Sequence, residues 1–137
     1  MKYLGLDLGS RTCGVAISDA LGMLARTYTT LRFKEDDYTY AANEVKRICK
    51  TEGVSVIVLG YPKHMNGDEG IRAQISQSFK SLLEEGTNLK VVLWDERLTT
   101  VVVDRAMIEG NLSREKRHQK KDELAAVVIL EDYLQSL

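Results

Sequence analysis

The sequence predicts an α/β fold in which a mixed five-stranded sheet carries helices on both faces (β-β-β-α-β-α-β-α-α). Three strand-like runs fill the first 33 residues and indicate a meander, after which strand-like and helical segments alternate. The run VSVIVLG at 54–60 is continuously apolar, which is typical of a strand buried on both faces by helices.

The N-terminal part predicts antiparallel strands. Residues 3–8 and 13–18 are short apolar runs joined by the tight turn Gly9-Ser10-Arg11-Thr12, and β-propensity predicts a third strand over 25–33. Apolar residues then recur at helical spacing over 36–52, and Gly53 is expected to end that helix.

In the C-terminal part, segments with helical spacing alternate with a strand-like run. Helical spacing predicts a helix over 68–85 that ends at Gly86, with Ile71 in its apolar stripe, and a strand follows over 89–94. A short helix over 99–109, a polar and charged loop over 111–121 and a last helix over 122–136 complete the chain, with Leu137 continuing the last apolar stripe.

Length and composition limit the possible classes. The 137 residues (15.4 kDa) are expected to form one domain, residues 1–137, that needs no disulfide or structural metal. The net charge of -1 excludes a polybasic chain, so binding of a polyanion would need local positive charge. Without a membrane span or a signal peptide, we expect a cytoplasmic protein with no membrane partner. Cys13 and Cys49 are predicted to be buried, reduced thiols.

Asp7 lies inside the first apolar strand, where an ionised carboxylate is costly to bury unless something pairs with it. Strand alternation puts it on the face of Gly5 and Gly9, so that space beside it is open. An Asp that accepts hydrogen bonds from the amides of the following turn is the alternative explanation.

Asp95, Glu96 and Arg97 directly follow the strand over 89–94, at the position where open α/β sheets place their sites. In isolation they would be a solvated loop with Arg97 paired to a neighbour. Strand alternation lets one of Asp95 and Glu96 share a face with the site, and both stay candidates.

Asp122 opens the predicted last helix and shares the helix face of Ala126, Ile129 and Tyr133. It is therefore expected to face inward, and Ala126 would let the helix approach the sheet closely. Capping and the helix dipole are the alternative explanation for an Asp at a helix start.

Three separate segments could thus bring carboxylates to one place. Clustered carboxylates repel each other unless cations lie between them. A pair of Mg²⁺ or Mn²⁺ ions, as nucleases use to activate water and stabilise the leaving oxygen, suits oxygen ligands, whereas His64 and His118 lack the spacing of a zinc site. The predicted metal ligands are Asp7, Asp95, Glu96 and Asp122, with Asp7, Glu96 and Asp122 as the catalytic set.

Two further segments suit a phosphate-bearing substrate. The glycine-rich stretch GYPKHMNGDEG (60–70) leads into a helix N-terminus, and Lys63 adds a positive charge. The stretch 113–121 has a local charge of +4, because it sets five cations against Glu115 alone: Arg114, Lys116, Arg117, Lys120 and Lys121. A flexible loop that closes on nucleic acid and a merely solvated loop both fit this composition.

Four motifs in order resemble the YqgF (RuvX) family, the Holliday junction resolvases of RNase H-like fold that are implicated in maturing small-subunit ribosomal RNA precursors. They are GLDLGSRTCGVAISD (5–19), GYPKHMNGDEG (60–70), WDERLTT (94–100) and DELAAVVILEDYL (122–134), and the resemblance spans nearly the whole chain. Tyr61 and Asn66 depart from the Leu and Asp usual in the family's glycine-rich loop, which affects that loop's contacts and not the carboxylate set.

The resemblance implies a metal-dependent endonuclease that processes the 5′ end of pre-16S rRNA or resolves Holliday junctions. It implies that Asp7 is the metal ligand of the first strand, that Glu96, with Asp95 nearby, is the second acidic element, and that Asp122 is the acid of the last helix. Arg11 and Arg97 match family positions that resemble contacts to substrate phosphates.

Two other functions stay open. A non-catalytic assembly factor that binds precursor RNA, on its own or in a pre-ribosomal particle, fits the near-neutral charge. The motif DLGSRTCGVAISD is also similar to the phosphate-binding hairpin of actin-like ATPases, which need two lobes where 137 residues provide for one. Both a monomer and a homodimer are compatible with the sequence, because symmetric nicking of two strands would need a dimer.

Overall fold

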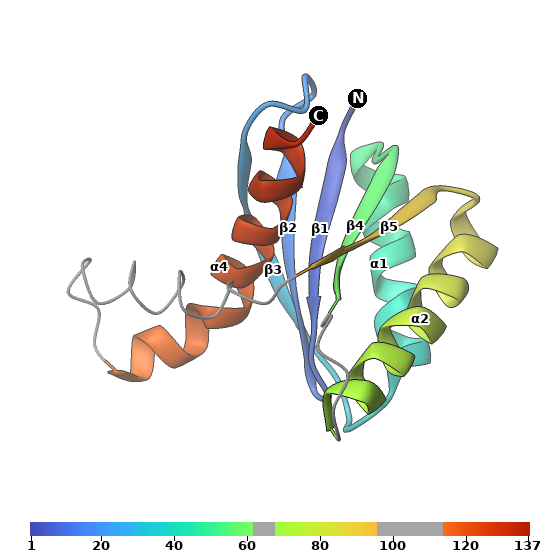
Figure 1. The fold of residues 1–137 in the computed structure, drawn as a ribbon, viewed down its shortest axis with the longest axis vertical. Helices are drawn as coiled ribbons and strands as arrows, with labels where there is room; N and C mark the ends of the chain where they lie inside the picture. Colours follow the sequence, from blue (N-terminus) through green and yellow to red (C-terminus); the bar gives the residue numbers. More distant parts are fainter. Residues whose placement is uncertain (62–67, 96–113) are drawn as a thin grey trace.

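The computed structural model describes the backbone of residues 1–61, 68–95 and 114–137, and the side chains of these residues except 68–69 and 114–122. Its sheet has the strand order β3-β2-β1-β4-β5 (Figure 1). The strands are β1 (Tyr3–Leu8), β2 (Thr12–Ser18), β3 (Ala25–Arg32), β4 (Val56–Tyr61) and β5 (Lys90–Asp95). β1, β2 and β3 pair antiparallel, while β4 and β5 run parallel to β1, so the predicted mixed sheet is confirmed.

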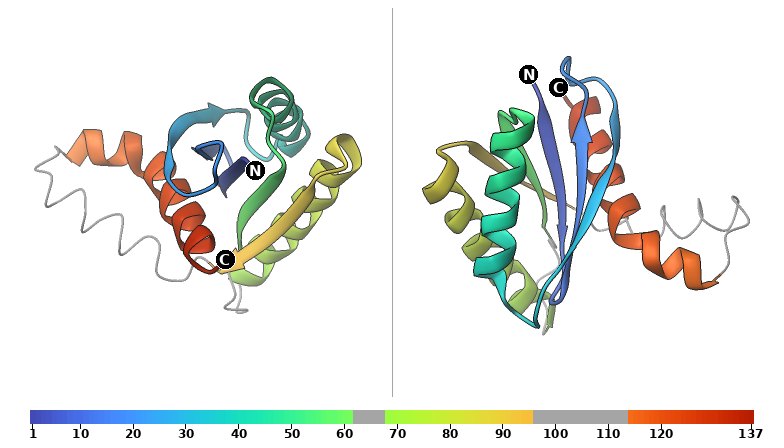
Figure 2. Two further views of the ribbon diagram at one scale, coloured as in Figure 1. Left: turned by 90° about the horizontal axis from the view of Figure 1, so that it is seen from above. Right: turned by 180° about the vertical axis from the view of Figure 1, so that it is seen from behind.

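Helices cover both faces of the sheet. Figure 2 shows α1 (Tyr38–Glu52) and α2 (Asp68–Thr87) on one side and α4 (Arg114–Gln135) on the other. We call these sides the α1/α2 face and the α4 face. None of the helices in the described part of the chain has the length and hydropathy needed to span a bilayer.

Local sequence sets the ends of α1 and α2. The Asp37 side chain accepts a hydrogen bond from the Tyr40 amide at the start of α1, and Gly53 ends it with a left-handed φ of 69°, as predicted. The prediction that α2 covers 68–85 and stops at Gly86 is wrong by two residues. The helix continues to Thr87, and Asn88, which tolerates the left-handed region better than most residues, takes a φ of 56°.

The two faces have separate cores. On the α1/α2 face, Leu4, Leu6, Val15, Ile57 and Phe79 belong to one buried cluster. The α4 face is packed with smaller residues, and its buried members are Ala16, Val58, Ala126, Ile129, Leu130, Tyr133 and Leu134. Because the strands of the α4 face carry small side chains, α4 lies close to the backbone of the sheet.

Three predictions about the helices need correction. The last helix begins at Arg114 rather than at Asp122, because Arg, Lys, Glu and Gln are good helix formers even where no apolar residue marks the period. Ile71 and Leu137 are exposed by 57% and 70%, so neither belongs to the core. The predicted helix over 99–109 lies outside the described residues.

Both cysteines are buried thiols, with Cys13 on β2 and Cys49 on α1. Burial raises the pKa of the Cys49 thiol to about 11. We expect Ellman's reagent at pH 8 to modify Cys49 in the folded protein about a hundredfold more slowly than in urea, because its thiolate fraction falls by about that factor. Equally fast modification of the folded protein would contradict the buried placement.

Candidate active site

Asp7 is half-buried on β1, in a row of residues that crosses the sheet. On one side it pairs with Gly14 of β2, which pairs with Thr30 of β3. On the other side, the register of Leu6 with Leu59 aligns Asp7 with Gly60, which pairs with Trp94. Asp7 therefore has a glycine on each neighbouring strand, so neither strand neighbour places a side chain beside its carboxylate.

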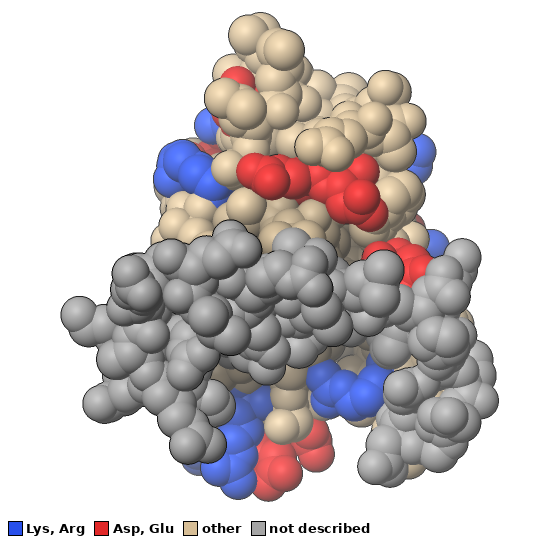
Figure 3. Space-filling view, turned by 60° about the vertical axis from the view of Figure 1, so that its left-hand side comes forward, with Lys and Arg blue, Asp and Glu red and all other residues tan. Residues whose placement is uncertain are grey.

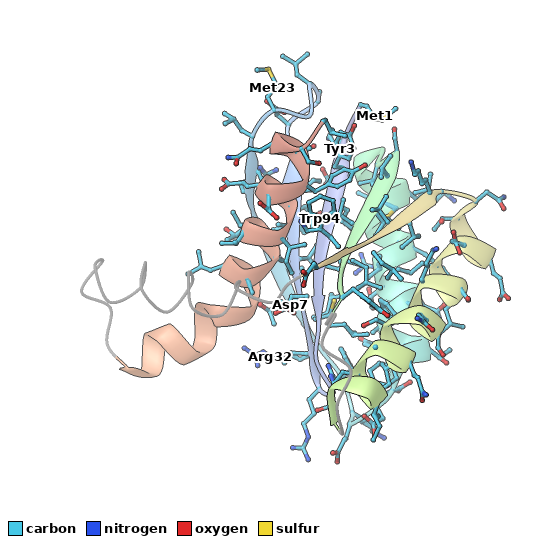
Figure 4. The ribbon with its side chains drawn as sticks, viewed as in Figure 1. Met1, Tyr3, Asp7, Met23, Arg32 and Trp94 are labelled. Carbon is cyan, nitrogen blue, oxygen red and sulfur yellow. The ribbon has the colours of Figure 1, made fainter. Side chains whose placement is uncertain are left out.

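This row lies on the α4 face. Gly5, two residues before Asp7, lies directly under α4: a Cβ atom there would be 2.7 Å from the Leu130 Cβ and 2.9 Å from the Ala126 carbonyl oxygen. Since side chains two residues apart on a strand share a face, Asp7 also points to the α4 side, together with Gly5. Figure 4 shows Tyr3, Trp94 and Asp7 in that order along the side of the sheet that α4 covers.

The path of α4 leads from the start of β1 toward Asp7. The Tyr133 ring lies 5.9 Å from the Tyr3 ring, and Ala126 and Leu130 lie over Gly5. From Gly5 to Asp7 the strand advances about 6–7 Å, and from Ala126 back to Asp122 the helix advances about 6 Å in the same direction. We therefore infer that the helical turn at Asp122 lies on the α4 face at the level of Asp7 along β1.

The position of Asp122 within α4 also excludes capping and the helix dipole as explanations for this residue. Asp122 lies eight residues inside α4, so it neither caps the helix nor lies in the first turn, where the helix dipole acts. The prediction that Asp122 opens the helix is wrong, and the correction favours a functional role for this carboxylate over a capping role.

Two contacts hold α4 in place over the site. The Trp94 indole N–H donates a hydrogen bond of 2.7 Å to Asp132 of α4, and its ring makes an edge contact with Tyr133 at 5.2 Å between centroids. Together with the close approach at Gly5, these contacts fix the helix across β1 and β5. The position of the Asp122 turn therefore depends on packing one to three turns further along α4.

Strand alternation places Asp95, the last residue of β5, on one face of the sheet. Trp94 packs on the α4 face, whereas Leu93 packs against the α1/α2 core. Asp95, the last residue of β5, therefore falls on the α1/α2 face, opposite Asp7. Glu96 lies outside the described residues.

Three arginines surround the end of β1. Arg11, a predicted phosphate contact, lies in the β1–β2 turn and pairs with Glu35 at 3.3 Å; both side chains are largely exposed. Arg32, on the same face as Thr30, extends to the α4 side below Asp7 (Figure 4). Arg72 of α2 donates a hydrogen bond of 2.6 Å to the Leu8 carbonyl and so fixes the end of β1.

Arg32 and Arg72 were not predicted from the sequence as residues near the site. Alternation along the predicted third strand could have placed Arg32 on one face, but not on the face of Asp7 without the register. The contact between Arg72 and a strand carbonyl is tertiary and leaves no pattern in the sequence.

The other predicted site residues are only partly described. Lys63, Glu96 and Arg97 lie outside the described residues. The basic stretch forms the first turns of α4, which extend away from the sheet (Figures 1 and 2), but the side chains of Arg114, Lys116, Arg117, Lys120 and Lys121 are not described. In Figure 3, Lys and Arg side chains lie below the band of grey residues, toward the end where the β1–β2 hairpin turns.

Among the described side chains, one buried polar atom near Asp7 has no hydrogen-bond partner. The Thr30 hydroxyl oxygen is buried and has no hydrogen-bond partner, and it lies in the same row as Asp7 with only Gly14 between them. A carboxylate, a buried hydroxyl and flanking glycines form the kind of polar surroundings that suit a hydrated cation. Within the ranges described, no three His, Cys, Asp or Glu side chains form a metal-binding group, and the side chains of Glu96 and Asp122 lie outside those ranges.

A pocket of about 460 Å³ lies elsewhere, between the start of α1 and α2. Tyr38, Ile71, Ile75 and Phe79 are among its lining residues, and Phe79 belongs to the α1/α2 core. The pocket is therefore on the opposite face of the sheet from Asp7.

Comparisons with known proteins identify the fold and the family. A curated relative from Geobacillus sp. (strain WCH70), named "Putative pre-16S rRNA nuclease", is 47% identical over 136 residues and is matched over 99% of both chains. T. thermophilus RuvC, solved in complex with a Holliday junction substrate, has a TM-score of 0.63 at 12% identity over 99% of this chain and 94% of that one. The fowlpox virus Holliday junction resolvase also has a TM-score of 0.63, at 13% identity over the whole of both chains.

The fold is therefore the RNase H-like fold of the RuvC-like resolvases, which confirms the predicted fold class. The model of the RuvX family, described as Holliday junction resolvase, matches residues 1–136. This chain belongs to the RuvX (YqgF) family, as its four motifs indicate.

Proposed function

We propose that this protein is a metal-dependent endonuclease that hydrolyses phosphodiester bonds of structured nucleic acid. The observation that carries the proposal is the environment of Asp7: a carboxylate on the α4 face flanked by Gly14 and Gly60, toward which the path of α4 leads the turn that contains Asp122. Two carboxylates brought together in a partly buried place repel each other unless a cation lies between them.

We assign Asp7, Glu96 and Asp122 as the ligands of Mg²⁺ or Mn²⁺, with two ions in the site. Asp95 falls on the opposite face by strand alternation, and Glu96 follows it in the sequence, so Glu96 is the better candidate of the two. When bound, such ions supply an activated water and stabilise the leaving oxygen. The protein's own part is to hold the carboxylates on a strand and a helix whose relative position is fixed by packing.

The substrate we propose is the 5′ end of precursor 16S rRNA, after the name of the 47% identical relative. Branched DNA is the second substrate, because the family model is described as Holliday junction resolvase. Contacts to the phosphates are assigned to Arg11, Lys63 and Arg97, and to the basic turns of α4 at Arg114, Lys116, Arg117, Lys120 and Lys121. Arg32 is added to this set because it extends from the same face as Asp7.

A cleavage assay with both substrates tests the proposal. Labelled precursor rRNA and a four-way DNA junction are incubated with the protein in Mg²⁺ or Mn²⁺, and we expect cleavage of the rRNA precursor at a defined position near the 5′ end. Preferential cleavage of the junction would instead assign resolvase activity. Binding of precursor RNA without metal-dependent cleavage of either substrate would favour the non-catalytic assembly factor.

Arg32 offers a direct test of the nucleic-acid surface. Arg32→Ala should weaken RNA binding about equally across sequences and reduce the slope of log K against log salt by about 1, because one phosphate contact is lost. Arg26→Ala is the matched control, since Arg26 is also exposed on β3 but pairs with Ile17 and falls on the other face. Equal salt slopes for Arg32→Ala and the wild type would remove Arg32 from the binding surface.

A further inference from the structure

The Thr30 hydroxyl is a buried polar group that lacks a hydrogen-bond partner in the described structure. Buried hydroxyls without a partner are rare, because each one loses its hydration without compensation. A valine would fill the same space on a strand without this cost. The hydroxyl at this position therefore needs a physical reason.

The place of Thr30 in the sheet supplies such a reason. Thr30 pairs with Gly14, and Gly14 pairs with Asp7, so the two side chains stand on the α4 face on either side of a position without a side chain. The Cα atoms of Asp7 and Thr30 are about 10 Å apart by the spacing of two strands. A carboxylate and a hydroxyl thus stand on the two sides of Gly14.

A β-bulge sets this alignment. Val15 pairs with Thr29 and Ala16 with Thr27, so Tyr28 is an extra residue on β3. Without it, Thr29 instead of Thr30 would oppose Gly14. Bulges occur often beside active sites, where they redirect a side chain.

The other described groups on this face, including Thr12 and Arg32 of the next row, leave the Thr30 hydroxyl without a hydrogen bond. Ala16, Ala126 and Leu130 are apolar, and the Trp94 N–H donates to Asp132. Thr30 therefore keeps an unused donor and acceptor on the side of the sheet where Asp7 lies.

We propose that the Thr30 hydroxyl hydrogen-bonds the water shell of the divalent cation that Asp7 holds, and so acts as a positioning residue of the site. The inference rests on the proposed function, because it needs a cation at Asp7. Mg²⁺ gives up its waters reluctantly, so a site that binds it through few carboxylates must offer partners to those waters. The hydroxyl gains its missing partner when the ion arrives.

Calorimetric titration with Mn²⁺ or Mg²⁺ alone, without nucleic acid, tests this role in the full chain. Thr30→Val, which keeps the shape and removes the hydroxyl, should bind the ion about tenfold more weakly than the wild type. The same variant, freed of metal, should melt roughly 2–4 °C higher than the metal-free wild type, because the unsatisfied hydroxyl is gone. A residue with a purely structural role would not change the two quantities in these opposite senses.

Two variants serve as controls. Thr30→Ser keeps the hydroxyl and should bind the ion nearly as tightly as the wild type. Thr29→Val makes the same chemical change one residue away, at a position that pairs with Val15 of the α1/α2 core, and should leave the affinity unchanged. If Thr30→Val does not fold, Thr30→Ala carries the same expectation for the affinity.

The outcomes separate this inference from the proposed function. Wild-type affinity in Thr30→Val, together with loss of binding in Asp7→Asn, would overturn the role of Thr30 and leave the metal site intact. No binding of either ion by the wild type would overturn both proposals. Weakened binding in both Thr30→Val and Thr29→Val would assign the effect to β3 as a whole and would also overturn the role of Thr30.

Discussion

Asp7→Asn is expected to reduce the single-turnover rate of cleavage by at least about a hundredfold while the protein stays folded. The substitution keeps the shape of the side chain and removes the negative charge that binds the cation, on which the activation of water depends. Because glycines flank Asp7 on β2 and β4, no neighbouring side chain in its row can take over the role of the carboxylate. The measurement is a time course with labelled precursor rRNA in Mg²⁺, with circular dichroism as the check on folding.

Asp19→Asn is the matched control for this loss. Asp19 is also a carboxylate beside the sheet, but it accepts hydrogen bonds from the Met23 and Leu24 amides in the β2–β3 turn, and an Asn oxygen can accept the same bonds. We expect wild-type cleavage from this variant. Full Mg²⁺-dependent activity in Asp7→Asn would contradict the assignment of Asp7 as a ligand.

Gly5→Ala is expected to destabilise the protein by about 1–3 kcal/mol, because the added methyl group would overlap the helix that covers it. Its Cβ would come within 2.7 Å of the Leu130 Cβ and 2.9 Å of the Ala126 carbonyl oxygen, so α4 must move away from the sheet. Such a shift also moves the Asp122 turn relative to Asp7, and displacements of about 1 Å can cost about a hundredfold in rate. Denaturant unfolding and cleavage by the folded variant measure the two effects.

Two observations keep this prediction specific. Trp94 is the only tryptophan and packs against Tyr133 of α4, so its emission should shift to longer wavelength if the helix moves. Gly70→Ala is the control, because a Cβ at this helical glycine meets nothing within 4 Å, and the change should stabilise α2 by about 0.5–1 kcal/mol. Unchanged stability and cleavage in Gly5→Ala would mean that the packing of α4 on the sheet does not control the site.

The elements whose information is local could be predicted from the sequence. Asp7 and its face followed from alternation along a short apolar strand, and the structure puts Leu4 and Leu6 in the opposite core. The close approach of α4 at Ala126 followed from the small residues on the inward stripe of the helix. Such patterns repeat within one element, so they need no knowledge of its neighbours.

Features that depend on pairing between elements could not be predicted in the same way. The row of Thr30, Gly14 and Asp7 depends on the bulge at Tyr28, which no residue of β3 signals. The start of α4 at Arg114 was missed because a charged stretch has no apolar residues to show a helical period. Because the helix was predicted to begin at Asp122, capping was an alternative explanation for this residue.

The central claim is that cleavage depends on a divalent cation held at Asp7. A single-turnover assay on 5′-labelled precursor 16S rRNA, with protein stripped of metal by EDTA and then given Mg²⁺, tests it most directly. We predict no cleavage in EDTA, recovery of cleavage on addition of Mg²⁺ to the wild type, and no recovery in Asp7→Asn. Cleavage at an unchanged rate in EDTA, or equal recovery in Asp7→Asn, would contradict the claim.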